Sequence, residues 1–198
     1  MKHERTWDGF ADILWITEHL NKGTEILELG SGNGKTLISL LKKGYLCTGV
    51  DFSASAVERI KERLASTEEE RRCRLIVSDV FDLPADTGTF DAIVMTYLLN
   101  HLTLNRAFEL FGEIPQLLKE NGLVFAEAFG PGDMRNSLNG KERNGILYNY
   151  HTMDDWRKLG GDGLQLMKLE AVRKEKNYDG QRVIREIIRG IWRRKARD

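Results

Sequence analysis

The chain of 198 residues contains little cysteine and proline, and it has no long apolar run. Its only cysteines are Cys47 and Cys73, too few for the disulfide framework of a small secreted domain or for a zinc site. Each lies in or beside a run that predicts a strand, so both are expected to be small core residues in a reducing compartment. The sequence therefore predicts a cytoplasmic protein without a bound metal.

Membrane and polyanion binding also lack a basis in the composition. No stretch approaches the roughly 18–20 apolar residues that cross a bilayer, and the first residues lack the apolar segment of a signal peptide. The formal net charge is zero, from 30 basic and 30 acidic residues, which argues against a general nucleic-acid or membrane-surface binder. Residues 182–198 carry an excess of positive charge, with seven basic and two acidic side chains.

The first two thirds of the chain alternate between strand-like and helical spacing of apolar residues. Strands are expected at residues 25–29, 45–50, 74–77, 90–95 and 123–127. Helices are expected at residues 7–20, 35–43 and 104–118. A further helix is expected to begin at the capping-box pattern of Ser55. Strands that alternate with helices need crossover connections, which predicts a doubly wound, mostly parallel α/β sheet with helices on both faces. Such sheets bind ligands at the carboxyl ends of their strands.

The last third gives a weaker pattern. Residues 130–151 are expected to form a long loop that contacts the substrate, and Thr152 to cap a short helix. Two final strands are expected at 164–173 and 183–192; helical spacing is also present in the second, but its β-branched residues and Gly190 favour a strand. No repeat or linker divides the chain, so a single domain over residues 1–198 is expected, with residues 1–22 as an N-terminal helix and possible lid.

The most informative stretch is the glycine cluster Gly30-Ser31-Gly32-Asn33-Gly34. Glycines after a strand let the backbone turn sharply and approach a ligand, and the next helix directs free N–H groups at it. A P-loop would need a glycine at position 29, where Leu29 stands, and a dinucleotide fingerprint would need one at position 35, where Lys35 stands. The spacing therefore argues against ATP, GTP and NAD.

With Glu28, the cluster resembles the first motif of the class I S-adenosylmethionine-dependent methyltransferases, an acidic residue followed by Gly-x-Gly-x-Gly. Three further features follow in the family's order: Asp51 ends the second strand, Asp79 follows the third, and residues 96–102 follow the fourth. The resemblance covers about residues 20–130. It implies a Rossmann-like methyltransferase fold with a seven-stranded sheet, an antiparallel strand near the C-terminus, and S-adenosylmethionine as cofactor.

The resemblance also implies roles for individual residues. Asp51 is expected to accept from the ribose hydroxyls, and Asp79 from the adenine amino group while the Val80 N–H donates to the ring. Glu28 would place negative charge near the cationic methionine end, and Phe52 would cover one face of the adenine. The cofactor-binding residues expected in this way are Glu28, Gly30, Ser31, Gly32, Asn33, Asp51, Phe52, Ser53, Asp79, Val80 and Thr96.

Each of these roles has a plainer structural alternative. Asp51, Ser53 and Asp79 stand where residues commonly cap the helix that follows. Thr96 stands where a strand simply ends. The ordered combination of these residues along the chain is what favours the cofactor-binding roles over the structural ones.

Catalytic residues do not follow from the family, because the sulfonium methyl is already activated and a base is needed only for a protonated acceptor. The candidates are His101, His151 and Tyr150, and His101 is equally suited to cap the next helix. Thr96-Tyr97-Leu98-Leu99 is not the Asp/Asn-Pro-Pro-aromatic motif of exocyclic-amine DNA methylation. No Pro-Cys pair exists for cytosine C5 chemistry.

Further polar and aromatic residues are candidates for the acceptor site. Arg135, Arg143, Tyr148 and Tyr150 would line a pocket, or else belong to a solvated connection. Trp7 is a lid or a core anchor.

The basic C-terminus, with Trp192 among arginines, would suit RNA phosphates and a stacked base, or would be a solvated strand end. The sequence favours a small-molecule methyl acceptor and no membrane partner. An RNA or protein acceptor, and a non-catalytic S-adenosylmethionine-binding partner protein, remain alternatives.

Overall fold

The computed structural model describes residues 11–138, 140–143, 145–178 and 181–196. Seven strands form one sheet in the order β3-β2-β1-β4-β5-β9-β8. Strands β1 to β5 are parallel, and β9 lies antiparallel between β5 and β8. The strands are β1 (Glu25–Leu29), β2 (Leu46–Asp51), β3 (Cys73–Val77), β4 (Phe90–Thr96), β5 (Leu118–Phe129), β8 (Leu164–Tyr178) and β9 (Gln181–Arg194). The expected doubly wound, mostly parallel seven-stranded sheet is confirmed.

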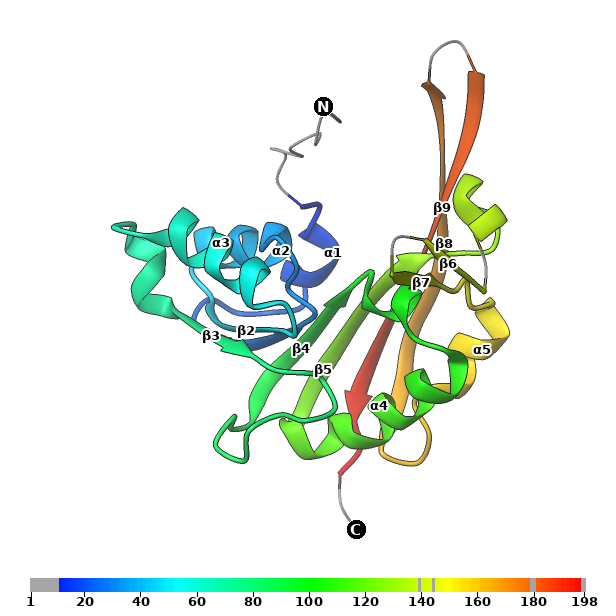
Figure 1. Cartoon of the computed structure of the whole chain (residues 1–198). Coiled ribbons are helices and arrows are strands. Elements are labelled where there is room, and N and C mark those ends of the chain that lie inside the picture. Colours follow the sequence, from blue (N-terminus) through cyan, green and yellow to red (C-terminus); the bar gives the residue numbers. More distant parts are fainter. Residues whose placement is uncertain (1–10, 139, 144, 179–180, 197–198) are drawn as a thin grey trace.

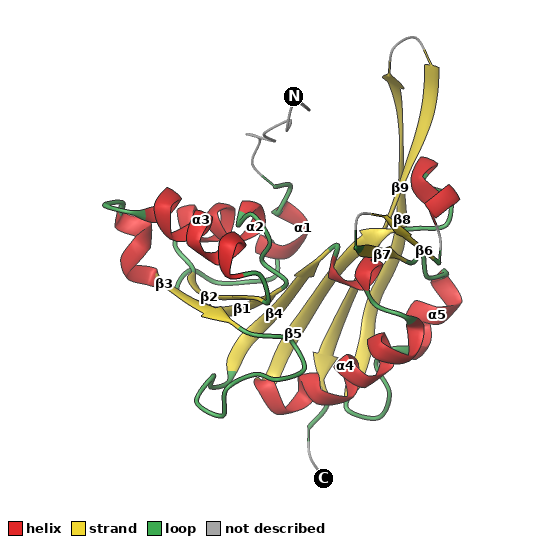
Figure 2. Ribbon diagram, viewed as in Figure 1, coloured by secondary structure: helices red, strands yellow, loops and turns green. Residues whose placement is uncertain are grey.

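Helices cover both faces of this sheet (Figure 2). On one face, Ile26 of β1 packs in a core with residues of α1 (Leu14–Thr17), α2 (Lys35–Lys42) and α3 (Ala54–Leu64). On the other face, Leu27 packs in a core with residues of α4 (Leu104–Leu117) and α5 (Met153–Lys158). Adjacent strand residues point to opposite faces, and both faces are buried, so β4 is apolar except for Asp91 and Thr96, and β1 except for Glu25 and Glu28.

Local side chains set the helix ends. The Ser53 hydroxyl accepts a 3.3 Å hydrogen bond from the Ala56 N–H, so α3 starts after Ser53 and the capping box expected at Ser55 is wrong. Gly44, at φ +92°, follows the end of α2 as expected. Thr152 caps α5 as expected, in a reciprocal capping box with Asp155.

Two expectations about less regular segments are wrong. Within the described residues, the helix expected at 7–20 is only the single turn α1, and no side chain caps its start; Trp7 lies outside the described residues. The expected loop at 130–151 contains a short helix at Met134–Leu138 and a hairpin of β6 (Lys141–Arg143) and β7 (Ile146–Tyr148). Strands of three residues are too short to show a period of two in the sequence.

The two final strands are confirmed and are longer than expected. Gly190 is required here because a Cβ at this position would lie 2.2 Å from the Trp192 ring. The ring is fully buried and packs edge-on against Phe111, 5.0 Å between centroids. The far end of the β8–β9 hairpin projects past the carboxyl ends of β4 and β5 (Figure 1). In the part of the chain that the structure describes, no helix is long and apolar enough to cross a membrane.

Candidate functional site

The glycine cluster forms a tight loop between β1 and α2. Gly30, Gly32 and Gly34 all adopt left-handed backbone angles, with φ of +73°, +52° and +75°. A Cβ on Gly34 would lie 2.7 Å from Ile60, whereas a Cβ on Gly32 would enter open space. Gly34 is therefore needed for packing, and Gly32 leaves room for a ligand to approach the backbone.

A cavity of about 380 Å³ lies beside this loop, in the size range of ligand sites. It opens at the carboxyl ends of β1 and β4, where the strand order reverses and open α/β sheets bind ligands. Its walls come from the glycine loop, the ends of β4 and β5, the segment before α1, and the β8–β9 hairpin. The lining residues are Ala11, Asp12, Gly30, Ser31, Gly32, Asn33, Lys35, Thr36, Thr96, Tyr97, Glu127, Lys174, Ile187 and Arg189.

Asp51, at the end of β2, fixes the loop from the neighbouring strand. Its Oδ2 accepts from the Gly32 N–H at 2.7 Å, and its Oδ1 accepts from the Ser53 N–H at 2.9 Å. The side chain is buried, and each carboxylate oxygen keeps a second lone pair for another donor. The helix-capping alternative is confirmed for Ser53, which caps α3, and is wrong for Asp51. The expected ribose contact of Asp51 stays a prediction.

The ends of β2 and β3 expose apolar surface next to a free carboxylate. Phe52 is 80% exposed and Val77 52% exposed, which is unusual for such residues beside a buried sheet. Asp79 is exposed, and its Oδ1 accepts from the Phe81 N–H, while Val80 is buried. An apolar platform beside a hydrogen-bond acceptor suits a purine ring.

Glu28 lies beneath the loop and is fully buried. Its Oε1 accepts from the Thr96 hydroxyl at 3.3 Å, and Thr96 in turn lies 3.1 Å from the Thr36 hydroxyl. Burial raises the pKa of Glu28 from 4.5 to about 8. Its Oε2 is buried without a hydrogen-bond partner among the described residues. In the ligand-free chain Glu28 is therefore mainly protonated at neutral pH, and it lies beneath the cavity and does not line it, so it does not supply the expected negative charge there.

One wall of the cavity is polar and was not predicted from the sequence. It consists of Tyr97, Glu127 and Arg189. Tyr97 has a left-handed φ of +63°, uncommon outside glycine and often a mark of a functional position. Its ring stacks on Phe129 at 4.5 Å, and burial and the nearby Glu127 carboxylate raise its pKa. Arg189 donates to Glu127 at 2.7 Å and pairs with Asp12 at 3.1 Å. The only available signal was the position of Tyr97 directly after β4.

The three predicted catalytic candidates do not line the cavity. His101 is exposed, with Nδ1 2.9 Å from the Leu147 carbonyl. His151 is buried, with Nε2 3.1 Å from the Leu99 carbonyl and 3.0 Å from that of Leu102. Tyr150 is buried in the segment after β7. Their placement gives both histidines structural partners and does not support a catalytic role.

The proposed acceptor residues are also dispersed. The Arg135 guanidinium lies 4.6 Å from the Phe129 ring centre, and Tyr148 packs on His101 instead of the cavity. Arg143 ends β6. Trp192 is unavailable for stacking on a base because it is buried against Phe111.

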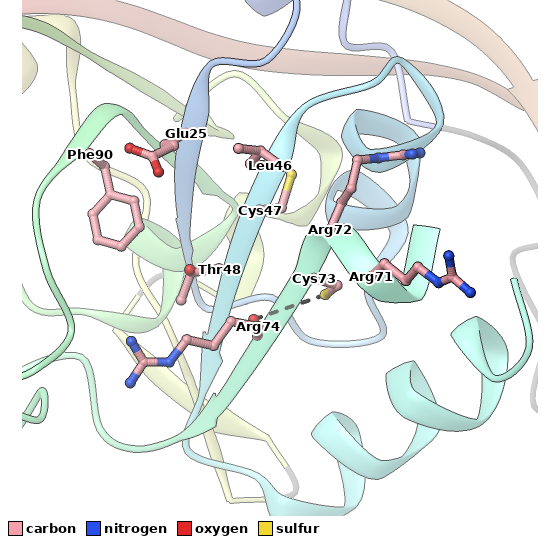
Figure 3. A pocket seen from close by; sticks show the side chains of 9 residues that line it. All are labelled: Glu25, Leu46, Cys47, Thr48, Arg71, Arg72, Cys73, Arg74 and Phe90. Atoms are coloured by element: carbon pink, nitrogen blue, oxygen red, sulfur yellow. Dashed lines mark hydrogen bonds between the residues drawn. The ribbon is translucent and has the colours of Figure 1, made fainter. Parts of the chain in front are cut away.

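A second hollow of about 250 Å³ lies at the opposite edge of the sheet, near the start of β2 and β3 (Figure 3). None of the expected site residues lines it, and the side chains of Arg71 and Arg72 point away from that of Arg74 (Figure 3). Burial raises the pKa of the Cys47 thiol well above its ordinary value and that of Cys73 to about 12. Both thiols therefore stay protonated, and neither is a nucleophile at neutral pH. No cluster able to hold a metal occurs among the described residues.

Comparison with known proteins agrees with this geometry. A family model described as a methyltransferase domain matches residues 26–122. An uncharacterized methyltransferase of Anoxybacillus flavithermus is 31% identical over 127 residues, which are 64% of this chain and 57% of that protein. The human tRNA N(3)-cytidine methyltransferase METTL2B is 27% identical over 145 residues, 68% of this chain and 37% of that protein. This chain thus spans little more than half of the first relative and about a third of the second.

The fold is shared with a solved S-adenosylmethionine-dependent methyltransferase from Methanosarcina mazei. The TM-score is 0.73, with 18% identity, and the match covers 91% of this chain and 97% of the other. The strand order, the glycine loop and the match to the family model lead to one assignment. Residues 26–122 thus match a methyltransferase domain, and the chain has the fold of S-adenosylmethionine-dependent methyltransferases.

Proposed function

We propose that the chain transfers the methyl group of S-adenosylmethionine to a small-molecule acceptor bound in the 380 Å³ cavity. One observation carries the proposal: a single cavity joins the glycine loop to Tyr97 and Glu127 at the ends of β4 and β5. A methyl donor held by the loop and an acceptor held at these strand ends would share the same enclosed space.

The cofactor supplies an already activated methyl group, so the residues of the chain have to bind, orient and exclude water. Gly32 and Asp51 shape the loop, and Glu28 lies buried beneath it. Tyr97, whose raised pKa keeps it protonated, lines the cavity with its hydroxyl directed at Glu127, and an acceptor would have to compete with that carboxylate for its O–H. Glu127 also lines the cavity, where it forms an ion pair with Arg189.

The size and polarity of the cavity support a small acceptor over a macromolecule. Three of the hairpin arginines, Arg173, Arg182 and Arg185, are paired with carboxylates within the chain. A phosphate backbone would need these cations unpaired, and Trp192 is buried away from any base.

An RNA acceptor is the second candidate. The observation in its favour is the likeness to METTL2B, whose name records methylation of tRNA cytidine. The chain spans 37% of that protein, so the likeness concerns mainly the shared cofactor domain.

The experiment that tests the proposal measures S-adenosylhomocysteine formation by the full chain with three sets of acceptors: small molecules, unmodified tRNA and an unstructured peptide pool. Turnover with small molecules alone is the expected result. Turnover with tRNA alone, and tRNA binding that weakens steeply with salt, would select the second candidate. Tight cofactor binding without turnover in any set would indicate a non-catalytic binding protein.

A further inference from the structure

We propose that the methyl acceptor is a small molecule with one anionic group, a carboxylate or a phosphate, and that Lys174 of β8 binds this group. The inference rests on the proposed function, because it names the chemical class of the acceptor in the same cavity. Lys174 lines that cavity from the hairpin side, opposite the glycine loop.

The pairing of the hairpin strands gives Lys174 no cross-strand partner of opposite charge. Its cross-strand partner is Arg185, and like charges directly opposite each other destabilise a sheet. The next pair along, Arg173 and Glu186, combines opposite charges and forms an ion pair. The like-charge pair therefore stands next to a complementary one and includes a residue that lines the cavity.

The charges around Lys174 leave its ammonium group available. Arg185 is compensated by Asp133 at 2.8 Å, and Glu175 and Glu186 are occupied by Arg182 and Arg173. Among the residues that the structure describes, Lys174 has no ion-pair partner. The cavity thus has a cation on its hairpin wall without a carboxylate to offset it.

Arg189, the other cation of this wall, does have carboxylate partners. It is compensated twice, by Glu127 at 2.7 Å and by Asp12 at 3.1 Å. A bound cofactor adds further positive charge, since its sulfonium and ammonium groups outnumber its one carboxylate. A cavity with this balance attracts an anionic acceptor and repels a cationic one.

One uncompensated cation fits one anionic group better than a chain of phosphates. Arg173, Arg182 and Arg185 lie along the same hairpin, and each already pairs with a carboxylate. Exposed aliphatic surface is present beside Lys174, since Ile187 also lines the cavity. The acceptor is therefore expected to combine an anionic group with an apolar body that fits within the cavity.

The test is a binding screen on the full chain saturated with S-adenosylhomocysteine. The probes are small organic carboxylates and phosphate monoesters, each with its uncharged amide or alcohol counterpart, and binding is read by saturation-transfer NMR. Affinities of the hits are then measured for the unmodified chain, Lys174→Gln, Lys174→Arg and Lys168→Gln. Lys168 is a matched control on the same strand, exposed and paired with Glu170 outside the cavity.

The expected result is that hits are mainly anionic, lose about tenfold or more of their affinity in Lys174→Gln, and keep it in Lys168→Gln. Lys174→Arg should retain most of the affinity, and affinity for S-adenosylhomocysteine should be equal in all four proteins. Hits that are equally often uncharged, no anionic hit, or equal loss in both lysine-to-glutamine variants would overturn the inference. Binding of tRNA that depends on Lys174, without binding of any small acid, would also overturn the inference.

Anionic hits that bind through Lys174 but are never methylated would contradict the proposed methyl transfer and leave the anion site standing. The two failures are therefore distinguishable.

Discussion

The Gly32 N–H donates a 2.7 Å hydrogen bond to Oδ2 of Asp51, which joins the glycine loop to the end of the neighbouring strand β2. The same carboxylate accepts from the Ser53 N–H through Oδ1, so it lies between the loop and the start of α3. If Asp51 also binds the cofactor ribose, as we propose, it would do so through its remaining lone pairs.

We predict that Asp51→Ala weakens S-adenosylmethionine binding by about 1.5–3 kcal/mol, the scale of hydrogen bonds to a charged group. Asp51→Asn should lose less, because its one carbonyl oxygen still accepts from a backbone N–H. Calorimetric titration gives the affinities, and circular dichroism checks that both variants fold. Unchanged affinity in a folded Asp51→Ala protein would remove Asp51 from the site.

Gly32→Ala should reduce cofactor affinity by about tenfold or more, because the new Cβ would occupy the open space beside the loop. The matched control is Gly44→Ala: Gly44 also has a positive φ and open space around it, but it lies at the far end of α2. Both variants should lose about 1–2 kcal/mol of stability from backbone strain. Equal cofactor affinity in the two variants would show that Gly32 does not face the ligand.

Phe52→Ala should weaken binding of adenosine-containing ligands by several-fold and leave the unfolding midpoint unchanged, because an 80% exposed ring contributes little to the core. Leu46→Ala is the control: Leu46 is a 40% exposed apolar residue at the opposite end of the same strand. If the Phe52 variant binds as tightly as the control, the ring has no contact with adenine.

Glu28 should make the stability of the ligand-free protein depend on pH. Its pKa is about 8 in the folded chain and close to 4.5 when exposed, so between these values unfolding releases a proton. The stabilisation is complete below pH 4.5 and is lost as the pH rises towards 8, by up to about 4 kcal/mol.

Urea unfolding from pH 5 to 8.5 checks this, with Glu28→Gln as the reference that cannot ionise. As the pH rises, the unfolding free energy of the unmodified chain should fall relative to that of Glu28→Gln. A difference that stays constant over this range would mean that Glu28 is ionised in the folded protein.

The sequence was sufficient for the features that depend on local spacing. The loop between β1 and α2, Thr152 as a cap and the central strands all follow from nearby residues, and the order of acidic strand ends identified the family. Ser53 and Ser55 both stand at positions suited to cap the helix, and the structure uses Ser53.

The acceptor side of the cavity was not predictable in the same way. Glu127 and Arg189 are 62 residues apart and meet only because β9 inserts beside β5. His151 was attractive as a polar residue in a loop, yet two backbone carbonyls hold it in the interior. Contacts made by strand order leave no local trace in the sequence, so residues brought together in this way are visible only in the fold.

Binding of S-adenosylmethionine by this chain is tested most directly by calorimetric titration of ligand-free protein with S-adenosylmethionine, S-adenosylhomocysteine, NADH and ATP. We expect micromolar binding of the two sulfur nucleosides and no binding of NADH or ATP. Failure to bind either sulfur nucleoside, in protein shown to be free of co-purified ligand, would contradict this expectation.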